Sequence, residues 1–208
     1  TQAGPLLNTD GSLAQKGWAK NLLLNYKRSD IKASPLRIKE WDYYCILQKD
    51  YGVALTVADN SYMALYAINV YDFTTNKEIT DMVMVPFTMG KLHLPEQSAH
   101  GDTMVNHKKV QMYFTHKNGK RVLDFNFPEF NKGKGIKGRI ELEALNKDSM
   151  VIATPWKEDK LAFYYNQKIN CLAVSGEFVF GGKEYTFTPD KALGVLDWGR
   201  GVWTYKNR

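Results

Sequence analysis

Runs of apolar and β-branched residues, separated by short polar links, dominate the chain from about residue 36 onward. They lie at residues 37–48, 52–59, 61–73, 78–87, 109–127, 135–145, 161–180, 183–189 and 194–203. Most are short and are bounded by turn-forming residues, which is typical of β-strands. The pattern predicts an antiparallel meander in which most successive strands are neighbours.

Two of the links carry hairpin signals. Asn118-Gly119 favours a two-residue hairpin turn, and residues 49–52 form a short Lys-Asp-Tyr-Gly link. Helical periodicity is weak, because Gly17 interrupts the one segment that could hold a turn or two. A sheet of about ten strands must close or fold onto itself to hide its edges. We therefore expect an all-β fold, an antiparallel lipocalin-like barrel or a strongly curved sheet.

The same pattern divides the chain into three segments. Residues 1–35 lack sustained periodicity, and we expect an N-terminal arm that wraps the domain. Residues 36–190 are expected to form the β-barrel domain. Residues 191–208 form a third segment, built around the strand-like run at residues 194–203. We expect this strand to find its partners largely in the remainder of its own polypeptide or in a second copy.

Composition and charge narrow the function only modestly. The 208 residues suit one β domain, and 28 Lys and Arg against 22 Asp and Glu give a net charge of +6 that is spread along the sequence. No recognition motif accompanies this excess, so nucleic acid is not expected as a partner. No apolar run approaches the roughly 18 residues of a membrane span. Cys45 and Cys171 lie in apolar runs without a CxxC spacing, and we expect free thiols in a cytoplasmic protein.

Three stretches of the chain carry a resemblance to a known family: residues 17–44, 148–170 and 194–207. They resemble an uncharacterised bacterial family, a domain of unknown function, and the similarity covers the whole chain. That family is similar, more distantly, to two-barrel lipocalin-like proteins that include carotenoid hydratases and natural-product cyclases. The resemblance implies that this chain is the N-terminal half of a two-barrel protein, in which residues 191–208 are a junction strand that leads into a second barrel absent from this chain. Asp197, Trp198 and Gly199 match an Asp, Trp and Gly near the junction of those barrels, although here no polar residue separates Asp from Trp.

The densest group of reactive side chains is residues 194–203, GVLDWGRGVW. On an undisturbed strand Asp197 and Trp203 face one side, whereas Trp198 and Arg200 face the other. A bulge at Gly199 would bring Arg200 to the face of Asp197. Beside Arg200 the carboxylate would be a charged ion-pair anchor, whereas among apolar walls it would be a neutral acid. Asp197 is therefore the candidate catalytic acid, with Arg200 as its partner or as a ligand anchor.

Alternation along two other runs adds candidate ligand-binding residues. Glu40 and Asp42 share one strand face, for which we favour exposure to solvent. Tyr165 and Gln167 share a face of the 161–180 run, and a polar row of this kind inside a barrel would line a ligand site. Tyr205 completes the set with Trp198 and Trp203, all three from residues 191–208.

Several functions remain open at this point. The first is the binding of a small apolar molecule inside a lipocalin-like barrel, with acid-catalysed hydration, isomerisation or cyclisation by Asp197. The alternative is a carbohydrate-active enzyme in which Glu40 and Asp42 lie near Asp197 beside aromatic platforms. A third is a non-catalytic structural domain, so whether the protein is an enzyme stays open. The histidine spacing does not suit a metal site, and neither a metal nor another cofactor is expected.

Overall fold

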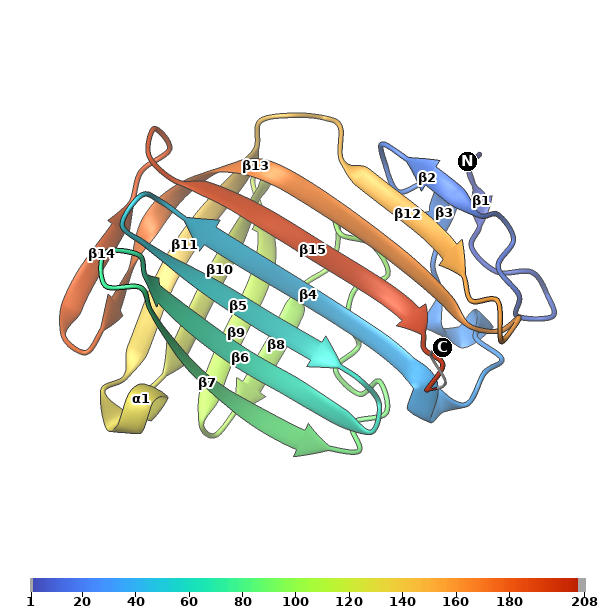
Figure 1. Ribbon diagram of the computed structural model, residues 1–208, viewed down its shortest axis with the longest axis horizontal. Helices are drawn as coiled ribbons and strands as arrows, with labels where there is room; N and C mark the ends of the chain where they lie inside the picture. The colour runs from blue at the N-terminus through green and yellow to red at the C-terminus, as the bar shows by residue number, and fades with distance from the viewer. Residues whose placement is uncertain (1, 206–208) are drawn as a thin grey trace.

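One antiparallel sheet, curled into a half-barrel, forms most of the molecule (Figure 1). The computed structural model describes residues 2–205. The main path of this 13-stranded sheet runs β7-β6-β5-β4-β15-β13-β11-β10-β9-β8, with β12, β14 and β2 paired beside it. The strands are β1 (Gly4–Pro5), β2 (Gly17–Ala19), β3 (Leu24–Asn25), β4 (Ile38–Leu47), β5 (Tyr51–Asp59), β6 (Met63–Asp72), β7 (Lys77–Pro86), β8 (Thr103–His107), β9 (Val110–Lys117), β10 (Lys120–Phe127), β11 (Ile136–Ala144), β12 (Met150–Pro155), β13 (Phe163–Phe180), β14 (Lys183–Phe187) and β15 (Leu193–Val202). Within residues 2–205, the helical elements are η1 (Arg28–Asp30), η2 (Pro35–Arg37) and α1 (Phe130–Gly133). The predicted all-β fold is confirmed.

The predicted hairpins are also confirmed. Asn118 and Gly119 form the two-residue turn between β9 and β10, with φ values of 52° and 76°. A type I′ turn requires positive φ at both central positions, which Asn and Gly adopt most readily. Residues 48–50 link β4 to β5, whose pairing runs from Glu40↔Asp59 to Leu47↔Gly52.

The last strand, β15, lies in the middle of the sheet (Figure 1). It pairs with β4 from Leu193 to Val202 without interruption, and with β13 on its other side. The expectation that its partners lie largely outside the chain is therefore wrong. These pairings join segments that are far apart in the sequence, so local patterns could not reveal them.

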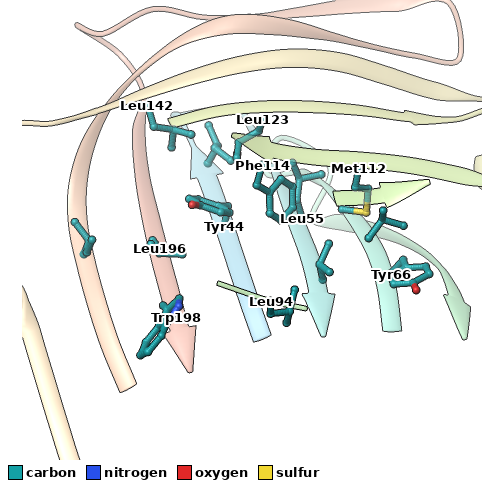
Figure 2. Close-up of a cluster of buried hydrophobic side chains, with 14 of the residues drawn as sticks. Tyr44, Leu55, Tyr66, Leu94, Met112, Phe114, Leu123, Leu142, Leu196 and Trp198 are labelled. Atoms are coloured by element: carbon teal, nitrogen blue, oxygen red, sulfur yellow. The ribbon is translucent and has the colours of Figure 1, made fainter. Parts of the chain in front are cut away.

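A packed apolar core fills the inner face of the curled sheet (Figure 2). Side chains of β4, β5 and β6 meet those of β9, β10 and β11, and the ring of Tyr44 lies edge-on to Phe114 at a centroid distance of 5.1 Å. Burying a large apolar side chain stabilises a fold by roughly 1.5–3 kcal/mol, so many such contacts hold the two halves of the sheet together.

The segment before β4 packs onto this sheet. β2 extends the sheet by pairing with β12, and β1 pairs in parallel with β3. Leu6, Leu7 and Tyr26 from the same segment are buried in the common core. The segment thus contributes side chains to the interior as well as covering it.

Two further expectations concern the thiols and the membrane. Cys45 and Cys171 are free cysteines, as predicted. Over residues 2–205 the helices are all too short and insufficiently apolar to cross a bilayer.

Candidate functional site

The strand β15 divides the candidate residues between the two faces of the sheet. Its register with β4 is continuous, so no bulge forms at Gly199. Trp198 and Arg200 consequently point into the half-barrel and are buried, whereas Asp197 lies on the outer face with a quarter of its side chain exposed. The ion pair between Asp197 and Arg200 that a bulge would have allowed does not form.

Arg200 is the centre of the inner-face site, and its side chain is 0% exposed. Its Nη1 donates to the backbone carbonyls of Trp41 and Gly199, both at 2.8 Å, and its Nη2 donates to the carbonyl of Pro95 at 2.7 Å. The guanidinium carbon lies 4.4 Å from the ring centroid of Trp198, a cation–π arrangement. The charge is thus fixed in one position by three separate parts of the chain.

Two buried carboxylates from β4 accompany this guanidinium. Asp42 Oδ1 lies 3.0 Å from Arg200 Nη2, and Glu40 accepts hydrogen bonds from Tyr26 Oη at 2.7 Å and from Arg28 Nη1. The interpretation of Glu40 and Asp42 as a solvent-exposed face is therefore wrong. Charged side chains are tolerated in an interior when they are paired, and here each carboxylate has an arginine.

Asp42 Oδ1 and Trp198 Nε1 are buried and lack a hydrogen-bond partner among the described residues, as does Arg121 Nε of the same site. The ion-pair contact of Oδ1 with Arg200 is close but lies outside hydrogen-bonding geometry. Asp42 and Trp198 line one small cavity with room of about 10 Å³, which is roughly the space of a single water molecule. Leu196 and Phe114 supply apolar walls. Asp42 Oδ1, which has only its ion pair with Arg200, and Trp198 Nε1 are therefore an acceptor and a donor without hydrogen-bond partners beside the same cavity.

The loop of residues 87–102, between β7 and β8, covers this end of the half-barrel. Its Pro95 carbonyl accepts from Arg200, and its Ser98 carbonyl accepts from Arg121 Nη2 at 3.0 Å. The two ring nitrogens of His116 lie 2.9 Å and 3.1 Å from the carbonyls of Gly101 and Ser98. Burial, with the nearby Arg121 charge, lowers the pKa of His116. Polar contacts at a few points hold this loop over the cavity.

Two tyrosines complete the inner face. Tyr165 Oη donates to the carbonyl of Leu24 at 2.9 Å, and burial raises the pKa of Tyr165 to about 12. Burial also raises the pKa of Tyr26, whose hydroxyl donates to Glu40. Both hydroxyls therefore act as hydrogen-bond donors at neutral pH.

On the outer face, Asp197 is a hydrogen-bond acceptor for three side chains. Trp41 Nε1 donates to its Oδ1 at 3.2 Å, Asn166 Nδ2 donates to the same oxygen at 2.6 Å, and Lys168 Nζ contacts Oδ2. Two neutral donors and the Lys168 ammonium thus fix this carboxylate in place on the outer face.

Aromatic rings gather beside Asp197. Trp41, Tyr164 and Trp203 stack on one another with centroid distances of 5.4–5.9 Å. The indole of Trp41 lies against Gly199, where an added Cβ would be only 2.0 Å from Trp41 Cζ2. Gly199 therefore leaves free the space that the Trp41 indole occupies.

The structure therefore brings together six of the nine candidate residues on the inner face: Glu40, Asp42, Tyr165, Gln167, Trp198 and Arg200. Asp197 and Trp203 lie on the other face, and Tyr205 follows the end of β15. The hypothesis of a carbohydrate-active enzyme placed Glu40 and Asp42 near Asp197. In the structure the two acids lie on the inner face of the sheet and Asp197 lies on the outer face.

Sequence reasoning missed several residues of the inner-face site: Tyr26, Arg28, Ser98, Thr103, His116 and Arg121. They come from the N-terminal segment, the 87–102 loop, β8, β9 and β10. None stands in a recognisable motif, and only the curling of the sheet brings them together. In the described part of the chain, no three His, Cys, Asp or Glu side chains are grouped so that they could hold a metal ion.

Fold and site together define a curled antiparallel β domain with a buried polar cluster at one end. Residues 1–208 match the family described as Domain of unknown function (DUF2804), and the chain belongs to this family. The search of curated proteins gives no match.

Three solved structures are similar to this chain at low sequence identity. An AttH-like protein from Nitrosomonas europaea is 10% identical with a TM-score of 0.55, over 88% of this chain and 57% of its own. Kievitone hydratase from Nectria haematococca is 10% identical, with a TM-score of 0.47 and coverage of 96% and 58%. CghA is 13% identical, with a TM-score of 0.48 and coverage of 96% and 54%. The chain thus spans between 54% and 58% of the length of these three proteins.

Proposed function

We propose that this chain is a ligand-binding domain that takes a small, largely apolar molecule at the inner-face site beneath the 87–102 loop. In this proposal Asp42 and Trp198 hold a hydroxyl group of the ligand. The observation that carries it is that two buried atoms, Asp42 Oδ1 and Trp198 Nε1, lack hydrogen-bond partners in residues that line one cavity. Buried polar atoms nearly always have a hydrogen-bond partner, so this pair calls for one.

A hydroxyl group suits the two atoms better than other polar groups. It donates one hydrogen bond, which the Asp42 carboxylate can accept, and its oxygen can accept the bond from the Trp198 indole. A carbonyl would leave Asp42 without a donor, and an ammonium would leave Trp198 without an acceptor. The apolar walls, Leu196 and Phe114, favour a hydrocarbon body beyond the hydroxyl.

Entry of such a molecule requires the 87–102 loop to move, because the closed cavity has room of only about 10 Å³. The loop is held by polar contacts that can exchange with water, among them those of Pro95 with Arg200 and of Ser98 with Arg121. Loops of this kind commonly open and close over binding sites. Binding is therefore coupled to opening of the loop.

The residues give less support to catalysis by Asp197. Its carboxylate lies on the outer face, away from the cavity, and is held by Lys168 and two neutral donors. We therefore propose binding without acid catalysis by this residue. The second barrel, which the family resemblance implies, stays a proposal about the remainder of the polypeptide.

The test is calorimetric titration with apolar alcohols from 1-hexanol to farnesol, each compared with its methyl ether. The proposal expects at least one alcohol to bind about tenfold more tightly than its ether, because the ether cannot donate to Asp42. Trp198→Phe should weaken alcohol binding by a similar factor. Tyr165→Phe is the matched control, since it alters the same face without altering the cavity lining. Equal affinity for every alcohol and its ether would reject the proposal.

A further inference from the structure

A large hollow lies on the outer face of β9, β10, β11 and β13, away from the inner-face site. It is an open groove of about 540 Å³, within the range of known small-molecule sites. Its polar lining includes Gln111, Tyr113, Asp124, Asn126, Arg139 and Glu177. A second hollow of about 230 Å³ shares Asn126, Lys137 and Val179 with it and continues toward Gly182.

Two glycines fix the close approach of β11 and β13 beneath this groove, Gly138 in its lining and Gly176 beside it. Gly138 lies between Phe125 and Phe178, and a Cβ there would be 2.7 Å from the first ring and 2.6 Å from the Cβ of the second. Gly176 has a φ of 124°, and a Cβ there would be 2.3 Å from the carbonyl oxygen of Arg139. Neither position accepts a side chain without a shift of the backbone. The close approach of the strands at these points therefore does not depend on mobile side chains.

The charges in the main groove balance. Arg139 Nη1 donates to both carboxylate oxygens of Asp124, at 2.9 Å and 2.8 Å. Lys137 and Glu177 add one charge of each sign. Because two cations and two anions line the same surface, a strongly charged ligand would meet a like charge wherever it lay. The groove therefore suits a ligand without net charge.

Neutral polar groups fill the spaces between these charges. Asn126 Nδ2 donates to Gln111 Oε1 at 3.0 Å, and Tyr113 lies opposite Asp124 on the neighbouring strand. Amides, a phenol, carboxylates and cations together present both donors and acceptors along the groove. Hydroxyl groups match such a surface because each of them donates and accepts.

We infer that this groove binds a neutral oligosaccharide. Its open shape suits a chain that lies across the strands. Val179 and the ring of Tyr113 provide an apolar surface for the carbon face of a sugar ring. The inference is independent of the proposed function, because the inner-face site lies on the other side of the sheet.

The experiment is a titration of the ¹⁵N-labelled protein with cellohexaose, xylohexaose, maltohexaose and mannohexaose, followed by backbone and side-chain amide shifts. The inference expects at least one sugar to shift Gln111, Asn126 and Arg139 in a saturable way, with a Kd below about 10 mM. Asn126→Ala and Tyr113→Phe should each weaken that binding severalfold. Glu143→Ala is the matched control, because Glu143 is exposed on β11 and lies outside the groove.

Two outcomes would overturn the inference. One is that no neutral sugar in the panel binds, or that the shifts map to a different surface. The other is that heparin or polygalacturonate hexasaccharides bind the groove more tightly than every neutral sugar, because the balance of charge is then not what selects the ligand. Thermal melting of each variant shows whether the fold is retained, and a loss of binding in a folded Asn126→Ala protein supports the site.

Discussion

Replacing Arg200 by Ala is expected to destabilise the protein more than any change to the outer-face carboxylate Asp197. Arg200 is fully buried, and its removal leaves the carboxylate of Asp42 in the interior without its ion pair. It also removes the donors to the carbonyls of Trp41 and Pro95. Breaking a buried pair by removing one partner costs about 3–5 kcal/mol, which is a large share of the stability of an ordinary domain.

Asp197→Asn is the comparison variant for Arg200→Ala, because Asp197 lies on the other face of the sheet. Asp197 and Lys168 form a pair on the outer face with side chains 25% and 28% exposed, and such pairs contribute roughly 0–1 kcal/mol. The amide of Asn can still accept from Trp41 and Asn166. Asp197→Asn should therefore cost less than about 1 kcal/mol.

Urea unfolding followed by circular dichroism measures both variants against the wild type. A double variant, Arg200→Met with Asp42→Leu, should recover much of the loss, because it removes the buried charge together with its partner. If Arg200→Ala costs less than about 1 kcal/mol, the inner-face ion pair does not stabilise the fold. An equal loss in Asp197→Asn would refute the assignment of the two residues to different environments.

Three further predictions concern other positions. Gly199→Ala should displace the Trp41 indole and cost about 1–3 kcal/mol in urea unfolding, with a changed tryptophan emission spectrum; an unchanged spectrum would contradict the packing. Burial lowers the pKa of Lys39 from its ordinary value of 10.5 to about 8. Between these two pH values the unfolded state therefore binds more protons at Lys39 than the folded state does, and the free energy of unfolding rises with pH. Lys39→Met should remove that rise, and an unchanged slope would refute it. Thiol titration should find two reactive groups after denaturation without reductant, and the exposed Cys171 should react before Cys45 in the native protein, where burial raises the pKa of Cys45.

Much of the fold could be predicted because strand patterns and turns are local. The Asn118-Gly119 turn needs only two residues, and alternation along β4 correctly separates Glu40 and Asp42 from Trp41. Which face is inside could not be predicted from that alternation. Hydrophobicity assigns Trp41 to the interior, yet the structure buries the two acids instead.

The reason lies in partners from distant parts of the chain. Arg28 reaches Glu40 from the N-terminal segment, and Arg200 reaches Asp42 from the last strand. Without these arginines the two carboxylates would have to face water. The central position of β15 could not be predicted for the same reason. Its partner β4 lies near the other end of the sequence, and no local pattern indicates that the two strands pair.

The central claim is that a ligand hydroxyl group lies between Asp42 and Trp198. The most direct measurement is a crystal structure of the protein purified from its own cells, at a resolution that distinguishes a water from a larger molecule. The proposal predicts a hydroxyl oxygen within hydrogen-bonding distance of Asp42 Oδ1 and Trp198 Nε1, a hydrocarbon body beside Leu196, and a displaced 87–102 loop. A single water at that position beneath a closed loop, with any bound molecule elsewhere, would contradict it.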